Sequence, residues 1–496
     1  MAKCIMIQGT ASSVGKSLLV AALCRIFKQD GYSVAPFKSQ NMALNSYITA
    51  DGHEMGRAQV VQAEAAGILP SVLMNPVLLK PTTDKKAQVI VNGKVLSNMS
   101  AVRYHDYKPQ LATLVKQSYE QLGAMHDIIV IEGAGSPAEI NLRDKDIVNM
   151  GLAEMVDAPV LLVGDIDKGG VFAALAGTML LLTDAEKARV KGVIINKFRG
   201  DISILEPGLD MLTDIIHRPV VGVVPYTKLQ IEDEDSVTER FKNTVNKNAE
   251  IDIAVIRLPH ISNFTDFNAL ENAPTVGLRY VSDVSTLGNP DCIIIPGSKN
   301  TIEDLLAIQN NGIAAQIVAL SQKGVPICGI CGGYQMLGQR IDDPYHTEGD
   351  RETIEGLGLL ACNTVLEQQK VTTQSEATCQ NGTGLFENLA GIRVSGYEIH
   401  MGRTTFDRQK GFEVPFGFAN LDGTVFGSYL HGIFDNAEFS QAFINHLRAI
   451  KGLPPMVEAV QSYRAFKEQQ YDLLASVVRA HLDMPYVYKI LNGDVV

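Results

Sequence analysis

Two segments in different halves of the 496-residue sequence combine residue types that could do chemistry. The first, Gly9-Thr10-Ala11-Ser12-Ser13-Val14-Gly15-Lys16-Ser17, joins an apolar run to the apolar helical run Leu18 to Phe27. Glycines in such a turn let backbone N–H groups converge on phosphate oxygens at a helix N-terminus. Lys16 would neutralise the β- and γ-phosphates of ATP, and the Ser17 hydroxyl would ligate Mg²⁺. The segment therefore predicts an ATP-binding P-loop, one residue longer than the common form, with Gly9, Thr10 and Gly15 in the cradle.

Polar side chains also follow later apolar runs, where ligands of parallel sheets gather. Glu132 ends one run and is predicted to be a second anchor for the metal, although a strand-end carboxylate satisfied within the protein is the alternative. Asp165 and Asp167 follow the next run, and Asn196-Lys197 follows another. Each signal is weak alone, but together these residues predict one polar rim at the edge of the first sheet where its strands end.

The second chemical segment is Pro326 to Gln335, where Cys331 lies between a strand-like run and a helix-like run, flanked by small residues. Such a turn exposes the sulfur and aims the N–H of the next residue, Gly332, at a developing oxyanion. A free thiol is mostly protonated at pH 7 and needs a histidine partner, for which His431 after a later strand is the candidate. Gly297, in the loop Pro296 to Lys299, is predicted to supply a second oxyanion N–H.

Cys328 and Cys331 also form a C-x-x-C pair, which could be half of a zinc site or a redox pair. No second pair completes a tetrahedral zinc site, and the context is not that of a thioredoxin-like helix. Cys328 is therefore interpreted as a small core residue of the strand. His400, taken alone, is interpreted as a structural histidine.

The elements that must position these residues follow an α/β pattern. Apolar runs without alternation, separated by helix-length segments, predict two doubly wound parallel sheets. The runs of the first are Cys4 to Ile7, Val34 to Phe37, Asp127 to Ile131, Pro159 to Val163, Gly192 to Ile195 and Val220 to Val224. Those of the second are Ile251 to Ile256, Val276 to Val281, Cys292 to Ile295, Val325 to Ile330, Arg393 to Ile399 and Val425 to Tyr429.

Domain boundaries are expected where these patterns stop. We expect a P-loop domain over residues 1–228, a solvated linker over 229–249 that carries the acidic run Glu232 to Asp235, and a second domain over 250–440. The remainder, 441–496, is expected to be a helical extension. Apolar residues at helical spacing from Tyr463 to Val478 predict a closing helix packed on the second domain.

Composition restricts the class of protein. A formal charge of -12 argues against a general electrostatic footprint for nucleic acid or for an anionic membrane. Seven scattered cysteines indicate a reduced, cytoplasmic setting. The N-terminus leaves no room for a signal peptide, and no apolar run approaches 18 residues, so an intracellular protein with no membrane span is expected.

On these residues the sequence resembles known families. The first half resembles P-loop enzymes of the dethiobiotin synthetase type, and the second resembles class I glutamine amidotransferases of the cobyric and cobyrinic subtype. Their combination resembles the glutamine-hydrolysing adenosylcobyric acid synthases of cobalamin biosynthesis. The most specific segments are Lys38 to Ser46, Asn196 to Asp201 and Gly396 to Arg403.

The resemblance implies ATP-dependent amidation of the b, d, e and g carboxylates of adenosylcobyrinic acid a,c-diamide, a cobalt corrinoid, with L-glutamine as nitrogen source. It implies that Cys331 and His431 are the glutaminase nucleophile and base. A glutamate usually follows the histidine by two residues, but Ile433 stands there, so the group that orients His431 is unassigned.

The resemblance also assigns binding residues in the first half. Glu54 joins Ser17 and Glu132 in holding Mg²⁺, and Asn196 reads the adenine. Lys38, Asn41 and Asn45 are expected to bind the substrate. Lys80 and Arg57, like Lys38, could offset substrate carboxylates, with a solvated surface role as the alternative.

Three other functions are compatible with the residues. A cobyrinic a,c-diamide synthase would amidate other corrin carboxylates with the same two modules. A P-loop switch of the chromosome-partitioning type would dimerise without covalent chemistry and would leave Cys331 and His431 idle. A P-loop scaffold with a dead amidotransferase domain would turn over ATP without responding to glutamine. The sequence indicates neither the oligomeric state nor the ammonia path.

Overall fold

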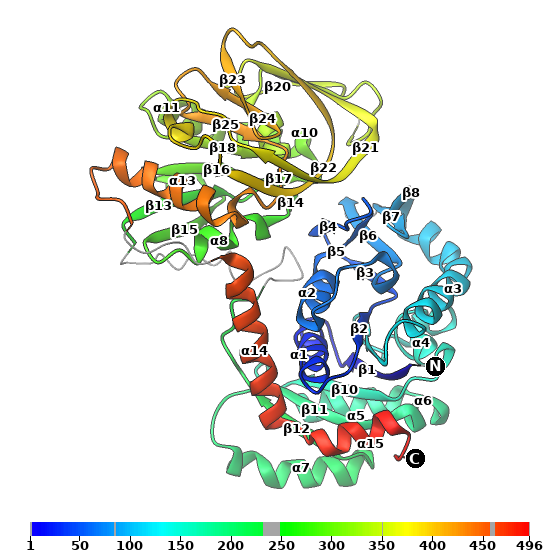
Figure 1. The fold of residues 1–496 in the computed structure, drawn as a ribbon. Coiled ribbons are helices and arrows are strands. Elements are labelled where there is room, and N and C mark those ends of the chain that lie inside the picture. The colour runs from blue at the N-terminus through cyan, green and yellow to red at the C-terminus, as the bar shows by residue number, and fades with distance from the viewer. Residues whose placement is uncertain (1, 84–85, 232–248, 350, 457–461, 496) are drawn as a thin grey trace. The chain divides into compact units, whose positions relative to one another are not determined.

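The computed structural model describes residues 2–83, 86–231, 249–349, 351–456 and 462–495, which form two compact units (Figure 1). The described residues of the first unit are 2–43, 54–83, 86–231 and 467–495, and those of the second are 44–53, 249–349, 351–456 and 462–466. The predicted acidic run Glu232 to Asp235 and most of the predicted linker lie outside the described residues. Each unit contains pieces that are separated in the chain.

A six-stranded sheet forms the centre of the first unit, in the order β12-β11-β10-β1-β9-β2, and all its pairs are parallel. The six predicted runs are its strands, which confirms this half of the fold. The strands are β1 (Lys3–Gly9), β2 (Val34–Phe37), β9 (Ile128–Glu132), β10 (Val160–Asp165), β11 (Val190–Phe198) and β12 (Val220–Pro225). Most of their residues are buried, because helices cover the sheet.

The helices of this unit follow the strands in alternation, as a doubly wound sheet requires. They are α1 (Lys16–Gln29), α2 (Arg57–Ala66), α3 (Ala101–Gly123), α4 (Met150–Met155), α5 (Val171–Leu181), α6 (Asp184–Arg189) and α7 (Ile202–Ile216). Helix α1 buries Leu19, Val20, Leu23, Ile26 and Phe27 in the core that it shares with the sheet.

A second, four-stranded sheet in this unit was not predicted. It has the order β3-β6-β7-β8, with β3 (Gln40–Met42), β6 (Val77–Thr83), β7 (Lys86–Val91) and β8 (Lys94–Ser100), and a short strand β5 (Glu54–Gly56) precedes α2. The exposed side chains of β8 make its apolar pattern weak, which explains why the sequence did not reveal it. The first strand of this sheet, β3, comes shortly after β2 in the chain, and the candidate residues Lys38 and Asn41 lie in this part of the sequence.

A seven-stranded sheet forms the centre of the second unit, in the order β15-β13-β16-β18-β25-β24-β23. Its parallel strands are β13 (Ile251–Ile256), β15 (Val276–Val281), β16 (Cys292–Ile295), β18 (Ile327–Ile330) and β25 (Val425–Ser428), which confirms five of the predicted runs. The edge strands β23 (Gly411–Val414) and β24 (Gly417–Asn420) are antiparallel. The sheet is therefore mixed and not wholly parallel.

The sixth predicted run, Arg393 to Ile399, is a strand of a different sheet, which corrects the expectation of one sheet per domain. It belongs to β22 (Arg393–Phe406), which pairs antiparallel with β21 (Cys362–Thr378) in a four-stranded sheet with β19 (Arg340–Asp342) and β20 (Thr353–Glu355). Burial alternates along much of β22, the pattern of a strand with one covered face.

Short elements complete the second unit. Two pairs of residues, β14 (Ile261–Ser262) and β17 (Gly297–Ser298), form a small antiparallel sheet, and β4 (Ser46–Ile48) comes from the early segment 44–53. The helices are α8 (Asn268–Glu271), α9 (Val284–Leu287), α10 (Thr301–Asn310), α11 (Ile313–Ser321), α12 (Gly332–Leu337) and α13 (Ala437–Ile450).

The C-terminal helices α14 (Tyr463–His481) and α15 (Met484–Asn492) belong mainly to the first unit, which corrects the expectation that they close the second domain. Tyr471, Leu474 and Val478 lie in the core of the first unit, and Arg25 of α1 pairs with Asp472 at 2.8 Å. Only Tyr463 and the partly buried Phe466 pack in the core of the second unit. Helical spacing indicates a buried face but not the core that receives it.

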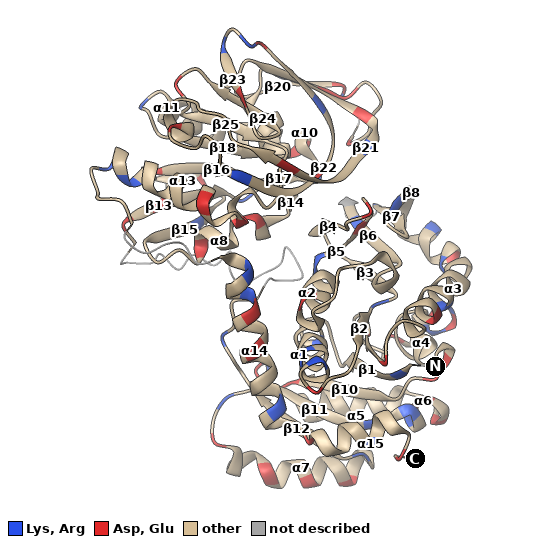
Figure 2. Cartoon of the chain, in the orientation of Figure 1, with Lys and Arg blue, Asp and Glu red and all other residues tan. Residues whose placement is uncertain are grey.

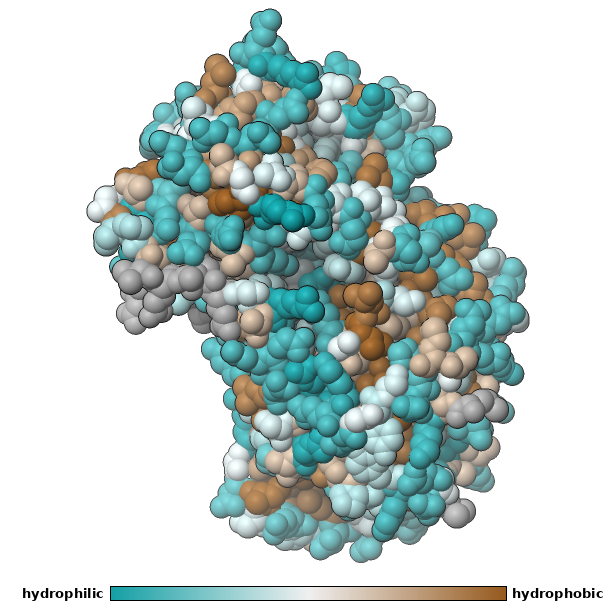
Figure 3. Space-filling model, viewed as in Figure 1, coloured by the Kyte–Doolittle hydropathy of each residue, from teal (hydrophilic) through white to brown (hydrophobic). Residues whose placement is uncertain are grey.

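Residues of both signs of charge occur in both units, and the acidic residues of α7 are visible as red bands in Figure 2. Exposed apolar residues also occur, as at Ile204, Met211 and Ile215 of α7, and the view in Figure 3 shows small brown groups among larger hydrophilic areas. Among the residues that the structure describes, no helix is long and apolar enough to cross a membrane.

Candidate functional site

The predicted P-loop links β1 to α1 in the strand, turn and helix order that phosphate binding requires. Gly15 precedes the helix with φ 97°, and a Cβ atom there would lie 2.2 Å from Nδ2 of Asn196. The Asn196 amide donates a hydrogen bond to the Val14 carbonyl at 2.8 Å. At the other end of the turn, the Thr10 N–H donates to the Val163 carbonyl at 2.9 Å. The structure thus brings Asn196 to the P-loop, and a Gly15 side chain would have no room.

Lys16 reaches across the turn. Its Nζ donates to the carbonyl of Ala11 at 2.9 Å and to that of Gly135 at 3.0 Å, and a Cβ atom at Gly9 would lie 3.0 Å from it. Gly135 belongs to the loop that follows Glu132 on β9, so the ammonium lies between two loops at the carboxyl edge of the sheet. An ammonium that donates to carbonyl oxygens can transfer to phosphate oxygens.

Glu132 is the centre of a buried polar cluster. Its Oε1 accepts from the Ser17 hydroxyl at 2.9 Å and pairs with Lys38 Nζ at 2.8 Å, and its Oε2 accepts from Gln62 Nε2 at 2.5 Å. The Glu132 side chain is 1 % exposed and that of Lys38 is 6 % exposed, so the two form a buried ion pair. A hydroxyl and a carboxylate side by side are hard oxygen donors of the kind that suit Mg²⁺.

The other predicted binding residues of the first half have different surroundings. Glu54 pairs with Lys80 at 2.9 Å, and both are buried. Asn41 is buried and donates to Gln59 Oε1 at 3.0 Å, whereas Asn45 belongs to the second unit. Lys38, Lys80 and Arg57 are all buried, so the alternative of a solvated surface role is wrong for these three cations.

The predicted rim is built from ion pairs between its own members. Lys197 pairs with Asp165 at 2.8 Å, and Arg199 pairs with Asp167 at 2.8 Å. The Arg199 guanidinium also stacks on the ring of Tyr226, 3.5 Å from its centroid. These contacts connect the carboxyl ends of neighbouring strands, as parallel order predicts.

In the second unit, Cys331 occupies a strained turn between β18 and α12. Its φ is 52° and its ψ is -107°, a conformation that residues with a side chain rarely adopt. The turn depends on Gly333, where a Cβ atom would lie 2.0 Å from the Ile295 carbonyl oxygen. Cys331 is 7 % exposed, whereas Cys328 is fully buried, and burial raises the pKa of the Cys328 thiol. Cys328 is therefore a core residue, as predicted.

His431 lies beside a buried carboxylate that the sequence did not reveal. Its Nδ1 is 2.7 Å from Oδ2 of Asp266, whose Oδ1 accepts from the Gly432 N–H at 3.1 Å. Asp266 lies in a 3₁₀ helix, Phe264–Phe267, far from His431 in sequence. This carboxylate is in place to orient the imidazole, the role left unassigned where Ile433 replaces the usual glutamate.

The surroundings of His431 favour its protonated form. Burial lowers the pKa of His431, but the charge and hydrogen bond of Asp266, together with the Cys331 thiol, outweigh burial and raise the pKa to about 10. The Nε2 atom is buried and has no hydrogen-bond partner among the described residues. It is therefore available to the sulfur and to a leaving group.

The two predicted oxyanion glycines lie next to this pair. A Cβ atom at Gly297 would lie 3.4 Å from Cε1 of His431, and one at Gly332 would lie 2.9 Å from the backbone nitrogen of Ser298. Ser298 is held in turn by Asp304 Oδ2 at 2.6 Å. The structure thus gathers Gly297, Gly332, Cys331 and His431 in one place.

The segment Gly396 to Arg403 on β22 passes directly over His431. The backbones of Tyr397 and His431 exchange two hydrogen bonds, of 3.1 and 2.9 Å, and a Cβ atom at Gly396 would lie 2.0 Å from the His431 carbonyl oxygen. The Tyr397 ring stacks on the imidazole with 5.2 Å between centroids. This close approach explains why the segment begins with glycine and tyrosine.

His400, further along β22, has the structural setting that the sequence suggested. It stacks on Tyr429 with 3.7 Å between centroids, and its Nε2 lies 3.3 Å from Glu398. Burial raises the pKa of Glu398, but hydrogen bonds from His400 and Ser375 outweigh burial and lower it. This pair supports the strand that covers His431.

Comparisons with known proteins agree with the division of the chain into two different α/β units. Residues 5–237 match the family of CobQ/CobB/MinD/ParA nucleotide binding domains, and residues 252–439 match the CobB/CobQ-like glutamine amidotransferase domains. Fold and site together define a protein with a P-loop nucleotide-binding unit and a glutamine amidotransferase unit in one chain.

Similar proteins specify the family. The chain is 57% identical to the cobyric acid synthase of Thermoanaerobacter sp. (strain X514) over 99% of both chains. It is 58% identical to that of Clostridium botulinum (strain Loch Maree / Type A3), over 99% of this chain and 100% of the relative. The chain therefore belongs to the cobyric acid synthase family, and it is a glutamine-dependent amide ligase of cobalamin biosynthesis.

Proposed function

We propose that this chain converts four side-chain carboxylates of adenosylcobyrinic acid a,c-diamide, those named b, d, e and g, into amides and so forms adenosylcobyric acid. ATP activates each carboxylate, and glutamine supplies the nitrogen. The observation that carries the proposal is the buried set Cys331, His431 and Asp266 in a chain that also holds Lys16, Ser17 and Glu132 at a P-loop. One set suits release of ammonia from an amide, and the other suits phosphoryl transfer.

The first half of the reaction makes the carboxylate reactive. A carboxylate oxygen attacks the γ-phosphorus of ATP, ADP leaves, and the product is an acyl phosphate whose leaving group is phosphate. Lys16 and the backbone N–H groups at the start of α1 balance the charge on the transferred group. Ser17 and Glu132 would hold Mg²⁺, which supplies further charge neutralisation when bound.

The second half releases ammonia from glutamine. The Cys331 sulfur attacks the amide carbon, His431 gives a proton to the departing nitrogen, and a thioester remains. Water then hydrolyses the thioester and yields glutamate. Asp266 keeps Nδ1 of the imidazole protonated, so that Nε2 carries the proton exchange, and the N–H groups of Gly297 and Gly332 stabilise the oxyanion.

Ammonia attacks the acyl phosphate and expels phosphate, which completes the amide. Each carboxylate therefore consumes one ATP and one glutamine. Ammonia is useful only before it is protonated or escapes, so we propose that it passes to the acyl phosphate without release to solvent.

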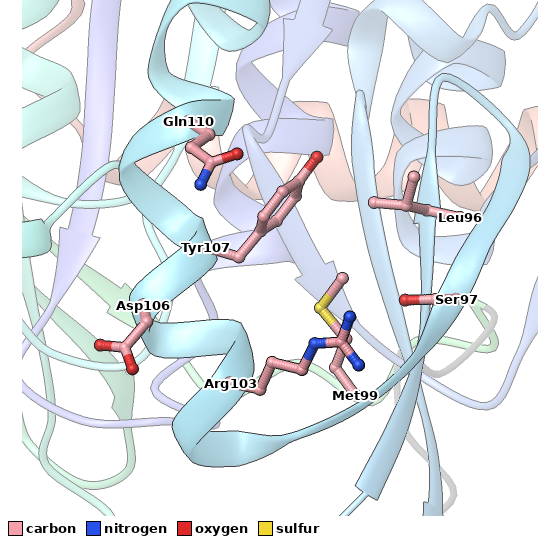
Figure 4. A pocket seen from close by; sticks show the side chains of 7 residues that line it. All are labelled: Leu96, Ser97, Met99, Arg103, Asp106, Tyr107 and Gln110. Atoms are coloured by element: carbon pink, nitrogen blue, oxygen red, sulfur yellow. The ribbon is translucent and has the colours of Figure 1, made fainter.

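The corrinoid needs a surface that accepts a flat apolar ring with acidic arms. A pocket of about 450 Å³ in the first unit lies between β8 and α3 and is lined by Leu96, Ser97, Met99, Arg103, Asp106, Tyr107 and Gln110. Figure 4 shows Tyr107 and Leu96 projecting into the space between helix and strand, with Arg103 beside Met99. An aromatic ring and a guanidinium suit these two features of the ligand.

The position of this pocket supports the same substrate. Tyr104 of α3 donates to Gln40 at 2.6 Å, two residues after Lys38, and Asp106 pairs with Lys145 at 2.8 Å, in the segment after Glu132. The pocket is therefore connected to both segments that leave the phosphate site. Lys38 and Asn41 remain predicted substrate contacts, although each already has a protein partner.

Two substitutions test the proposal with glutamine or ammonium as nitrogen source. Cys331→Ala is expected to abolish glutamine-dependent amidation of the corrinoid while ammonium still supports it, because only ammonia release needs the thiol. Lys16→Ala is expected to abolish both, because both need the acyl phosphate. If Cys331→Ala still uses glutamine, the nucleophile is wrong; if Lys16→Ala retains amidation, ATP activation at this P-loop is wrong.

A further inference from the structure

Ten residues, Leu44–His53, belong to the second unit although both of their neighbours in the chain belong to the first. They contain β4, and Ile48 is fully buried against Tyr397 and Ile399 of β22. Farther along, the Thr372 hydroxyl donates to the Gly52 carbonyl at 2.9 Å. An early piece of the chain is therefore part of the unit that holds the glutaminase residues.

Through Ser46, this segment contacts Asn263, a side chain at the nitrogen edge of the His431 ring. The backbone N–H of Ser46 donates to Oδ1 of Asn263 at 3.2 Å. Because an N–H can donate only to the oxygen of the amide, this bond determines which end of Asn263 faces the ring. Its Nδ2 consequently lies 3.4 Å from Nδ1 of His431, the same nitrogen that Asp266 approaches at 2.7 Å.

The segment also contacts Tyr397, whose ring covers the face of the imidazole. The Tyr397 hydroxyl donates to the Ser46 carbonyl at 3.2 Å, while the Tyr397 ring stacks on His431. Tyr47 packs edge-on against Tyr397 with 5.1 Å between centroids. Ser46 is thus bonded through both of its backbone groups to two side chains, Asn263 and Tyr397, that contact the imidazole.

The ends of the segment are anchored within the first unit at neighbouring residues of β6. The Ala43 N–H donates to the Leu79 carbonyl at 3.1 Å, and Glu54 pairs with Lys80 at 2.9 Å. Lys38, a few residues earlier, pairs with Glu132 of the phosphate site. The run from Lys38 to Ser46 therefore has one end at the phosphate cluster and the other at the residues around His431.

From this connection we infer that Ser46 and Asn263 are positioning residues for His431, and that through them the segment Leu44–His53 makes glutamine hydrolysis depend on ligands bound at the P-loop unit. A shift of β3 or β6 moves Ser46, which turns the Asn263 amide and the Tyr397 ring against the imidazole. The inference rests on the proposed glutaminase activity. It also gives a reason why Lys38 to Ser46 is such a specific part of the sequence.

The first test compares substitutions at Asn263 in the full-length chain. Asn263→Ala is expected to lower kcat of glutamine hydrolysis about tenfold with little change in KM, since orientation of the base is lost and not glutamine binding. Asn263→Asp keeps an acceptor for Ser46 and adds a negative charge near Nδ1. It should therefore move the alkaline limb of the pH profile of kcat upward by about one unit. Asn420→Ala, which removes a bonded amide from a distant hairpin, is the control for general loss of stability.

The second test concerns the dependence on ligands. Glutamine hydrolysis is measured with and without ATP and the corrinoid, in the wild type and in Tyr397→Phe, which keeps the ring but loses the bond to Ser46. We expect added ligands to change the rate severalfold in the wild type and much less in the variant. An equal response in both proteins would overturn the dependence on ligands.

The outcomes separate this inference from the proposed function. If Asn263→Ala matches Asn420→Ala in kcat and Asn263→Asp leaves the pH profile unchanged, the positioning role is wrong, while loss of glutamine use in Cys331→Ala would leave the proposed function intact. If Cys331→Ala still hydrolyses glutamine, the proposed function fails first.

Discussion

Replacing Asp266 by asparagine keeps the size of the side chain and removes the negative charge beside His431. The rise of the His431 pKa from 6.5 to about 10 corresponds to at most about 5 kcal/mol in favour of the imidazolium. Without the carboxylate, burial is the main remaining effect and lowers the pKa, so the imidazole becomes neutral at pH 7. We expect glutamine-dependent amidation to fall by about 10²–10⁴-fold, while amidation with ammonium stays unchanged.

The assay follows glutamate release and corrinoid amidation side by side for the wild type, Asp266→Asn and the control Asp252→Asn. The control removes an ion pair with Arg279 at 2.8 Å elsewhere in the second unit. A wild-type rate of glutamine hydrolysis in Asp266→Asn would refute the assignment of Asp266 as the orienting group.

The same substitution has a signature in stability. Because the pKa of His431 is raised in the folded state, its contribution to the free energy of unfolding is complete below about pH 6.5 and is lost as the pH rises through about 10. The difference in unfolding free energy between wild type and Asp266→Asn should therefore shrink across this range in urea titrations. A difference that stays constant between pH 6.5 and 10 would contradict the pairing.

Three further predictions concern other parts of the two units. Gly396→Ala places a Cβ atom against the His431 carbonyl. It should lower the free energy of unfolding, measured with urea, by about 1–3 kcal/mol and abolish glutamine use. A variant as stable as the wild type would show that the strand can move aside. Cys331→Gly should be more stable than Cys331→Ala by about 1 kcal/mol in free energy of unfolding, and should unfold at a higher temperature, because glycine relieves the positive φ. Equal midpoints of thermal unfolding in the two variants would argue against backbone strain at this position. Arg103→Gln and Tyr107→Ala should each raise KM for the corrinoid about tenfold and leave KM for ATP unchanged. An unchanged KM for the corrinoid would exclude this pocket as its binding site.

Much of the fold was predictable because local sequence decides it. The buried strands of the two main sheets are short, continuously apolar runs, and such runs can be recognised in the sequence itself. The places of Lys16 and Cys331 were predictable for a related reason, since each follows a strand and lies at the start of a helix. When the reactive residue and the turn that positions it are contiguous in the sequence, the sequence alone is enough to recognise them.

Asp266 and Ser46 could not be found in this way, because their roles depend on contacts between distant parts of the chain. Nothing around Asp266 marks it except that an acid stands between Phe264 and Phe267, a sign that its carboxylate is buried and needs a partner. The bonds of Ser46 to Asn263 and Tyr397 use its backbone groups, and the type of a side chain does not indicate which backbone bonds a residue makes. The partner of an amphipathic helix such as α14 is likewise decided by tertiary packing.

The C-terminal helix α15 packs in the same core as the first strand, β1, and this restricts the order in which the chain can fold during synthesis. Val487, Ile490 and Leu491 of α15 belong to the same hydrophobic core as Ile5 and Ile7 of β1. At 5–20 residues per second, a ribosome completes these helices on the order of a minute after it has released β1. The first strands to be synthesised must therefore wait, with part of their core uncovered, for the last helices, and this interval is when we expect the nascent chain to depend most on chaperones.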